Sequence, residues 1–439
     1  MRRAWGVLIA GLLGLTAALI TGRDLYFYIA YLSLGALIVC ALWVWSAVRS
    51  VGLSRRTSST HSQVGRPFEE YFTLRNSSWL PKLWLVVHDD SDVPGYSASR
   101  VVHNLGPQRE FSWTGRVICE KRGRFRLGPM AISSSDPLGL FELRRELPRT
   151  SSVLIYPATV PLRRLPQLPG YLPGGDSLRR RTHDVTANAS GVRDYLPGDG
   201  FNRVHWRSTA RKDRLIVKEF ELDPMLDTWI FLDMHHEVHV RVNLDESEVA
   251  LRRHASLWRQ LARVDLDPST EEYAVTAAAS LAQFLIRSGR SVGMVAYGQA
   301  REIIQPDRGE RQLGKILEAL AALRAVGKTP FEDVLSGDGR RPSRGSTIIA
   351  ISPSVSLMWA HATLFLDRSA IRFVNVLVDA ASFGGRGDAS TVRDALRSTG
   401  WPVITLHRDD SLEEVLSANA SPSEAGLVTG LHACVQASV

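Results

Sequence analysis

Two long apolar runs dominate the first fifty residues. The first extends from Ala4 to Thr21 without a charge, and the second extends from Leu25 to Val48 after a short polar break. A helix needs roughly 20 apolar residues to cross about 30 Å of hydrocarbon, and both runs come close to that length or exceed it. The pattern predicts a transmembrane helical hairpin over 1–50. A cleavable signal peptide is the alternative for the first run, because Arg2 and Arg3 precede it, but it leaves the second run unexplained.

Basic residues flank the two runs unevenly. The outer flanks carry Arg2, Arg3, Arg49, Arg55 and Arg56, whereas the hairpin turn offers only Arg23, beside Asp24. Arginine and lysine are retained on the cytoplasmic side of a membrane. We therefore expect a cytoplasmic-membrane protein with both ends inside, so that everything after about residue 50 lies in the cytoplasm.

The pattern after the hairpin changes to short alternating runs separated by polar turns. Residues 54–62 are polar and unpatterned, and we expect them to form a linker. The alternating runs that follow lie at 69–74, 83–87, 111–117 and 125–127. Short strands at close spacing predict a small all-β, sandwich-like domain over 63–156. A stretch rich in Pro, Gly and Arg is expected to act as a linker over 157–190.

The C-terminal half alternates between buried-strand and helical patterns. Residues 228–232 form a continuous apolar run, as expected for a strand covered on both faces. Further strands are expected at 291–297, 347–351, 373–378 and 403–406, with helices at 269–288, 310–325, 358–365 and 390–398. This alternation predicts an α/β domain of Rossmann type, with a mainly parallel sheet, over 224–417. Residues 418–439 are small and polar, and are expected to form a flexible tail.

Composition narrows the chemistry. The three cysteines Cys40, Cys119 and Cys434 are too far apart for a zinc motif and too few for a disulfide framework. The net charge of +8 comes mainly from basic residues near the membrane end, where anionic lipid accounts for them, so no nucleic-acid partner is expected. The sequence has no P-loop, HExxH or GxSxG motif. We therefore expect neither a cofactor nor an enzymatic activity.

Several motifs resemble one known family. They lie at 121–129 and 136–141, and more specifically at 192–199, 203–211 and 215–221. Together with the apolar hairpin and the α/β pattern, they resemble the bacterial domain of unknown function 58 family, whose members are membrane-anchored and related to von Willebrand A domains. The resemblance implies a von Willebrand A-like α/β domain. As partners it implies a MoxR-type AAA+ ATPase and other membrane proteins of the same gene cluster.

The family signature occupies 191–223. Its characteristic residues here are Arg193, Asp194, Tyr195, Pro197, Gly198, Asp199, Arg203, Trp206, Arg207, Ala210 and Arg211. One departure is His205, where the family has Asp. The dense Arg–Asp alternation suggests either an internal clamp of ion pairs or a docking surface for an acidic partner. We expect a clamp at Trp206, Asp199 and Arg207, and docking at flanking residues such as Arg180 and Lys212.

The von Willebrand A resemblance also raises the question of a metal. That family's site combines Asp-x-Ser-x-Ser with a later Thr and Asp. Here Asp233 remains, His235 and Glu237 replace the two serines, and Thr329 matches the threonine. Mg²⁺ needs more oxygen ligands than this set offers, so we expect no bound metal.

The favoured function is a membrane-anchored, non-enzymatic scaffold that works with a MoxR-type ATPase in assembly, maturation or cell-envelope processes. The alternative is a metal-dependent hydrolase that uses a zinc cluster of Asp233, His235 and His236. The two are separated by ligand geometry, because an enzyme needs convergent groups in a concave site.

Overall fold

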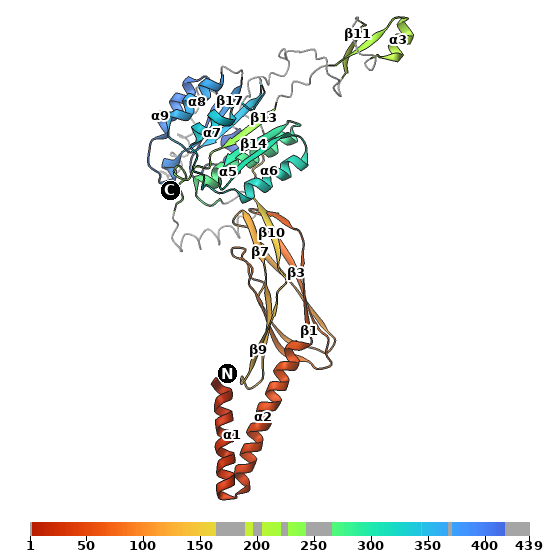
Figure 1. The fold of residues 1–439 in the computed structure, drawn as a ribbon, viewed down its shortest axis with the longest axis vertical. Helices are drawn as coiled ribbons and strands as arrows, with labels where there is room; N and C mark the ends of the chain where they lie inside the picture. The colour runs from red at the N-terminus through yellow and green to blue at the C-terminus, as the bar shows by residue number, and fades with distance from the viewer. Residues whose placement is uncertain are drawn as a thin grey trace, which may run out of the picture. The chain divides into compact units, whose positions relative to one another are not determined.

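The computed structural model describes residues 2–163, 189–195, 204–220, 227–242, 266–343, 345–367 and 371–417. The chain divides into two compact units, Met1–Ala158 and Thr159–Val439. Figure 1 shows the elements of each unit. The predicted tail over 418–439 and most of the predicted linker over 157–190 lie outside the described residues.

Two apolar helices open the first unit, as the sequence predicted. They are α1 (Arg2–Thr21) and α2 (Asp24–Arg49), and both are long and apolar enough to cross a membrane. They pack closely where α1 has glycines: a Cβ added to Gly11 would come within 3.0 Å of the Cβ of Ser33. Large side chains point outward, with Ile20 84% and Leu32 76% exposed. This surface suits hydrocarbon rather than water.

Strands fill the rest of the first unit, over residues 51–156, which we call the β unit. They are β1 (Val51–Thr57), β2 (His61–Gln63), β3 (Pro67–Asn76), β4 (Lys82–Asp89), β5 (Arg100–Leu105), β6 (Glu110–Ile118), β7 (Gly123–Leu127), β8 (Met130–Ser135), β9 (Glu142–Leu147) and β10 (Ser151–Tyr156). They form sheets of order β1-β3-β6, β2-β10-β7 and β5-β4-β8-β9. In β3 the buried residues alternate with accessible ones, so one face of this strand forms core.

The predicted linker over 54–62 is wrong. Residues 51–57 form β1, which pairs with β3 in antiparallel register from Val51 opposite Asn76 to Thr57 opposite Glu70. The strand escaped the hydrophobic pattern because its inward-facing residues include Arg55, whose charge is neutralised inside the β unit.

The signature segment contributes a small two-stranded sheet and one short helix. Antiparallel β11 (Ala189–Asp194) and β12 (Ile216–Phe220) pair with each other, and α3 (Trp206–Lys212) lies between them in sequence. Val204, Ile216 and Val217 are the buried side chains that the structure describes here. Residues 196–203 of the signature lie outside the described residues.

A six-stranded sheet forms the centre of the second unit. Its strands are β13 (Thr228–Leu232), β14 (Val292–Tyr297), β15 (Arg301–Asp307), β16 (Thr347–Ser352), β17 (Arg372–Val378) and β18 (Val403–Leu406). Their order is β15-β14-β13-β16-β17-β18, and all neighbouring pairs are parallel except β14 with β15. The predicted mainly parallel sheet is therefore confirmed. The antiparallel edge strand β15 was missed because its side chains are mostly accessible.

Helices pack on both faces of this sheet. They are α5 (Thr270–Arg287), α6 (Glu310–Ala322), α7 (Phe331–Asp338), α8 (Leu357–Asp367), the 3-10 turn η2 (Ala380–Phe383), α9 (Ala389–Ser398) and α10 (Leu412–Ser417). Side chains of α7, α8 and α9 share one buried cluster with Trp229 and Phe231 of β13. The intervening residues of β13 point to the opposite face, where α5 contacts the strand. Helices thus cover both faces of the sheet, so a functional site on the sheet is to be sought at the ends of its strands.

Candidate functional site

Asp233 and Ser352 meet at the carboxyl edge of the parallel sheet. Leu232 of β13 pairs with Ile351 of β16, so the next residue of each strand reaches the same point of the edge. The Ser352 Oγ donates to Asp233 Oδ2 at 2.6 Å, and the backbone N–H of His235 donates to Asp233 Oδ1 at 2.9 Å. Strand order reverses beside β13, and such switch points are where open α/β sheets bind ligands.

Burial governs the electrostatics of this pair. Withdrawal from water raises the pKa of Asp233 to about 6; the hydrogen bonds from Ser352 and His235 oppose the rise, and the nearby charge of Glu332 adds to it. Asp233 is 2% exposed and Ser352 fully buried. A substrate cannot contact either group without a rearrangement. The Asp233–Ser352 hydrogen bond therefore links the ends of the two central strands β13 and β16.

The nearby histidines bond to separate partners. His239 lies 3.0 Å from the carbonyl oxygen of Asp233 through Nε2, and 3.1 Å from the hydroxyl of Thr270 through Nδ1. The Nδ1 of His236 lies 3.0 Å from the carbonyl oxygen of Gly327. The rings of His235 and His236 are nearly perpendicular, with centroids 5.1 Å apart.

These side chains do not form a ligand set. Thr329 is half-buried ahead of α7, and both Asp233 oxygens bond to other groups. Within the described ranges, no three His, Cys, Asp or Glu side chains gather as metal ligands would. The absence of a metal stays a prediction. Elemental analysis of the purified chain tests it, and near-stoichiometric Mg, Mn or Zn would contradict it.

The signature helix α3 has a well-defined start and end. His205 caps its first turn by accepting from the backbone N–H of Ser208 at 3.2 Å, and its ring nitrogen lies 2.7 Å from the Ser208 hydroxyl. The departure from the family's Asp therefore preserves a capping acceptor. Asp213 ends the helix in the left-handed region, at φ 51°. The helix is fixed to β12 by the bond from His205 N to Ile216 O, at 2.8 Å.

The signature residues face outward. None of the residues in α3 is buried, and Trp206 is 65% exposed. Arg207, Ala210 and Arg211 are exposed as well. Within the described residues neither Trp206 nor Arg207 is buried, and the expected clamp at these positions stays a prediction.

The remaining signature residues divide into described and undescribed positions. Asp194 forms an ion pair of 3.0 Å with Arg214 across the two strands, and both side chains are more than half exposed. Tyr195 is half-buried. Arg193 lies in β11, but its side chain is outside the described atoms. Also outside the described residues are Pro197, Gly198, Asp199, Arg203 and the flanking Arg180.

A buried charged network in the β unit was missed from the sequence. Arg55 of β1 bonds to both carboxylate oxygens of Glu70 on β3, through Nε at 2.7 Å and through Nη2. Its Nη1 also lies 3.4 Å from Asp89 Oδ1, and the Tyr96 hydroxyl donates to Glu70 at 2.5 Å. Burial alone would lower the pKa of Arg55, but the bonds to Glu70 outweigh it and raise that pKa. Burial, followed by the bond to Glu70, raises the pKa of Tyr96.

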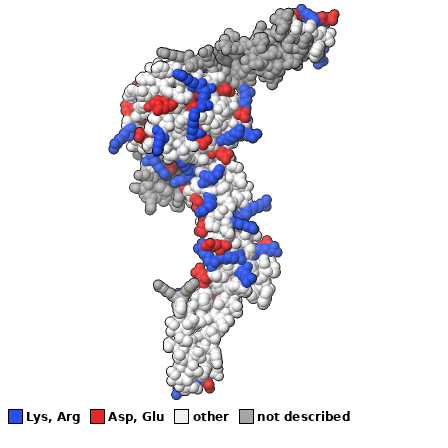
Figure 2. Space-filling view, viewed as in Figure 1, with Lys and Arg blue, Asp and Glu red and all other residues white. Residues whose placement is uncertain are grey.

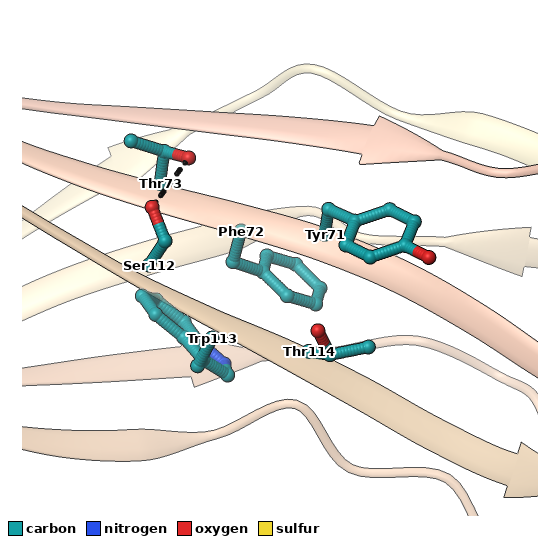
Figure 3. Close-up of a pocket in the computed structure, with 6 residues that line it drawn as sticks. All are labelled: Tyr71, Phe72, Thr73, Ser112, Trp113 and Thr114. Atoms are coloured by element: carbon teal, nitrogen blue, oxygen red, sulfur yellow. Dashed lines mark hydrogen bonds between the residues drawn. The ribbon is translucent and has the colours of Figure 1, made fainter.

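A shallow pocket of about 280 Å³ lies on the same unit, over β3 and β6. Figure 3 shows its six residues, Tyr71, Phe72, Thr73, Ser112, Trp113 and Thr114. The Phe72 and Trp113 rings stack at 5.1 Å, and the hydroxyls of Thr73 and Ser112 bond to each other at 3.1 Å. The lining contains no carboxylate, histidine, cysteine or lysine. It therefore offers packing surface rather than acid–base chemistry.

Comparison with known proteins places the signature in a family. The family model described as "Protein of unknown function DUF58" matches residues 191–257. A relative in Bacillus subtilis (strain 168), "Uncharacterized protein YeaD", is 21% identical over 364 residues, which cover 78% of this chain and 82% of that protein. Over its signature segment the chain is similar to the DUF58 family.

Solved structures add nothing to this DUF58 assignment. The CARDB domain of the PF1109 protein from Pyrococcus furiosus is 16% identical, with a TM-score of 0.19, and the match covers 24% of this chain and 91% of that one. The DNA glycosylase AlkC of Pseudomonas fluorescens is 19% identical, with a TM-score of 0.18, and the match covers 31% of this chain and 42% of that one. Scores this low support no statement about fold or function.

Proposed function

We propose that this DUF58-like protein is a membrane-anchored, non-enzymatic scaffold that binds a protein partner through α3. The observation that carries the proposal is the exposure of Trp206, at 65%, on a helix with no buried residue. Exposed tryptophan and arginine are the residue types that most often dominate binding energy at protein interfaces. When a partner covers a large exposed indole, apolar surface is removed from water, and this stabilises the complex.

The chemistry of this surface favours an acidic partner. Arg207, Arg211 and Lys212 are exposed along α3, and Arg211 and Lys212 occupy its last turn. Arginine recognises carboxylates through a planar fork of donors. The resemblance to the family makes a MoxR-type AAA+ ATPase the proposed partner, together with membrane proteins of the same gene cluster.

The α/β part of the second unit is proposed to be a von Willebrand A-like domain. Support comes from its sheet order, with five parallel strands, one antiparallel edge strand and Asp233 directly after the central β13. Because Asp233 and Ser352 are buried and bonded to each other, they give no reason to propose that the chain hydrolyses a substrate there. A fixed strand edge fits a binding module better than a catalytic one.

The two apolar helices are proposed to anchor the chain in the cytoplasmic membrane, with both termini inside. Their length and composition support a transmembrane hairpin. The placement of Arg2, Arg3 and Arg49 on one side, against Arg23 in the turn, supports the orientation. The body of the protein would then meet its partner in the cytoplasm.

Capture from detergent extracts tests the docking surface. The full chain should enrich an AAA+ ATPase, identified by mass spectrometry, and Trp206→Ala or the double change Arg207→Ala with Arg211→Ala should abolish it. Trp206→Phe, which keeps an aromatic ring, should retain most of the capture. Arg287→Ala is the matched control, since Arg287 is an exposed arginine in the last turn of α5.

Thermal stability separates docking from a structural role. Trp206→Ala should change the free energy of unfolding by no more than about 0.5 kcal/mol, as for an exposed position. Trp359→Ala should cost about 3–5 kcal/mol, because Trp359 is fully buried in the core. Undiminished capture by Trp206→Ala would show that Trp206 is not part of the interface. A large loss of stability in this variant would instead support the clamp.

A further inference from the structure

The turn between β8 and β9 lies beside the helical hairpin, and this position has a consequence for the membrane. The turn, residues 136–141, is built around Asp136, which accepts from the backbone N–H of Leu138 at 2.9 Å and of Phe141 at 2.6 Å. Leu140, in the same turn, and Cys40 of α2 are both buried, and α2 contacts β8 and β9 on either side of the turn. Figure 1 shows this end of β9 beside the start of α1 and the flank of α2. The turn is therefore fixed against the hairpin.

The packing of the helices sets the depth of this turn. Gly14 faces Ala30 and Gly11 faces Ser33. The two helices are therefore antiparallel in register, so that a step of three residues toward the start of α1 corresponds to a step of three residues toward the end of α2. By the same step Arg3 comes level with about residue 41 of α2. Consistently, a Cβ added to Gly139 in the turn would lie 3.4 Å from Nη1 of Arg3. The turn thus sits at the level where the charged end of α1 marks the edge of the apolar span.

The last turns of α2 continue beyond that level and pack against the β unit. Their buried residues, Cys40, Val44, Ala47 and Val48, recur at helical spacing on one face, and α2 contacts β4, β8 and β9. The other face keeps Trp45, whose ring lies 4.7 Å beneath the guanidinium of Arg49. Tryptophan and arginine are typical of the boundary between lipid and water.

Leu138 occupies the exposed tip of the turn. Its side chain is 60% exposed, although the neighbouring Asp136 and Leu140 are buried. Figure 2 shows the hairpin as a surface almost without charge, with blue and red appearing only at its ends. An apolar tip at the same level as that boundary, flanked by Arg3, matches a bilayer surface in both polarity and charge.

We propose that the β8–β9 turn is a membrane-contacting loop, with Leu138 inserted at the boundary between lipid headgroups and acyl chains. This rests on the proposed membrane anchor but goes beyond it, because a hairpin can cross a bilayer while the β unit stays in water. The contact gives the β unit a second attachment besides α2. It also fixes which side of the β unit faces the membrane.

Fluorescence quenching in vesicles tests the contact. The native cysteines are changed to serine, and Leu138→Cys is labelled with an environment-sensitive fluorophore. The full chain is reconstituted in vesicles of phosphatidylcholine and phosphatidylglycerol. Ser59→Cys is the matched control, because Ser59 is exposed and follows β1, which runs away from α2.

The label at position 138 should be quenched by a lipid-borne nitroxide and should be about tenfold less accessible to iodide than the label at position 59, because ions are excluded from an apolar medium. Equal iodide quenching at both positions, in vesicles that retain the chain after a carbonate wash, would overturn the contact and leave the anchor intact. Extraction of the chain by carbonate would overturn the anchor, and the contact with it.

Discussion

Asp233 shows how one buried carboxylate couples folding to pH. Burial raises its pKa to about 6, above the value of about 3.9 for an aspartate in water. The folded chain therefore holds the proton more tightly than the unfolded chain does. This contribution to stability is fully present below the unfolded pKa and is lost as the pH rises through the folded pKa.

Asp233→Asn should accordingly stabilise the sheet at neutral pH. The neutral amide avoids burying a charge, so the free energy of unfolding at pH 7.5 should rise by up to about 3 kcal/mol, and the gain should fade toward pH 4. Hydrogen–deuterium exchange of β13 and β16, measured at several pH values, checks this. Asp333→Asn, at an exposed position of α7, is the control. A destabilisation by Asp233→Asn that grows as the pH rises would contradict this, because the sheet would then need the ionised carboxylate.

The buried ion pair of Arg55 and Glu70 makes a second residue-scale prediction. Glu70→Leu leaves a guanidinium inside the β unit and should cost about 3–5 kcal/mol in unfolding free energy. Adding Arg55→Met should recover part of that loss, since no charge of this pair is then left alone. Thermal melts of the full chain in detergent measure both.

The adjacent Glu69 provides the control. It pairs with Arg116 at 3.4 Å on the surface, with the two side chains 36% and 63% exposed. Glu69→Leu should change stability by less than about 1 kcal/mol. Equal losses for Glu69→Leu and Glu70→Leu would mean that the network contributes no more than a surface pair.

Some residue-scale features could be predicted from the sequence, and others could not. Asp233 could be singled out because it directly follows the apolar run 228–232, which is the buried strand β13. Arg55 was assigned to a linker because a charged residue on an inward face looks the same in sequence as a solvated one. Trp206 was expected to be buried because large aromatics usually are, and its exposure of 65% could not be predicted from its neighbours in the sequence.

The junction of α2 and β1 is the feature to test at the scale of elements. Arg145 of β9 donates through Nη1 to the carbonyl of Arg49 at 3.1 Å, and through Nη2 to that of Val51. Lys82 of β4 donates to the carbonyl of Ser46 at 2.8 Å. Cations at a helix C-terminus satisfy its last carbonyls and interact favourably with the helix dipole.

Arg145→Ala should therefore loosen this junction. Losing the two carbonyl contacts should cost about 1–2 kcal/mol, which exchange measurements on residues 45–53 would detect as faster deuteration. Arg144→Ala is the control, because Arg144 pairs with Asp90 at 3.4 Å on the surface and is 48% exposed. Identical exchange in the two variants would mean that Arg145 does not cap the helix.

At this scale the sequence was most informative where one pattern dominates. The strand at 228–232 has the predicted bounds because it is buried on both faces. The helix predicted at 269–288 is α5, and its start is fixed by Ser269, which accepts from the backbone N–H of Glu272 at 3.2 Å. By contrast, β5, β9 and β15 are mostly accessible, and β8 buries the polar Ser133 and Ser134, so hydrophobic alternation alone does not reveal these strands.

For the whole molecule, the arginine distribution predicts the orientation in the membrane. An alkaline phosphatase fused to the C-terminus should stay inactive, because that enzyme folds only outside the cytoplasm. The same reporter fused after Arg23, in the hairpin turn, should be active. Activity of the C-terminal fusion, with silence of the turn fusion, would reverse the proposed topology.

The passage from α2 to β1 involves a single residue, Ser50, between Arg49 and Val51. A connection this short, held by side chains of β4 and β9, is rigid and does not act as a hinge. In a bilayer, a long helix answers a change of thickness by tilting. Because the β unit is attached rigidly to that helix, a tilt of α2 caused by thinning or thickening of the membrane also rotates the β unit and displaces its far end.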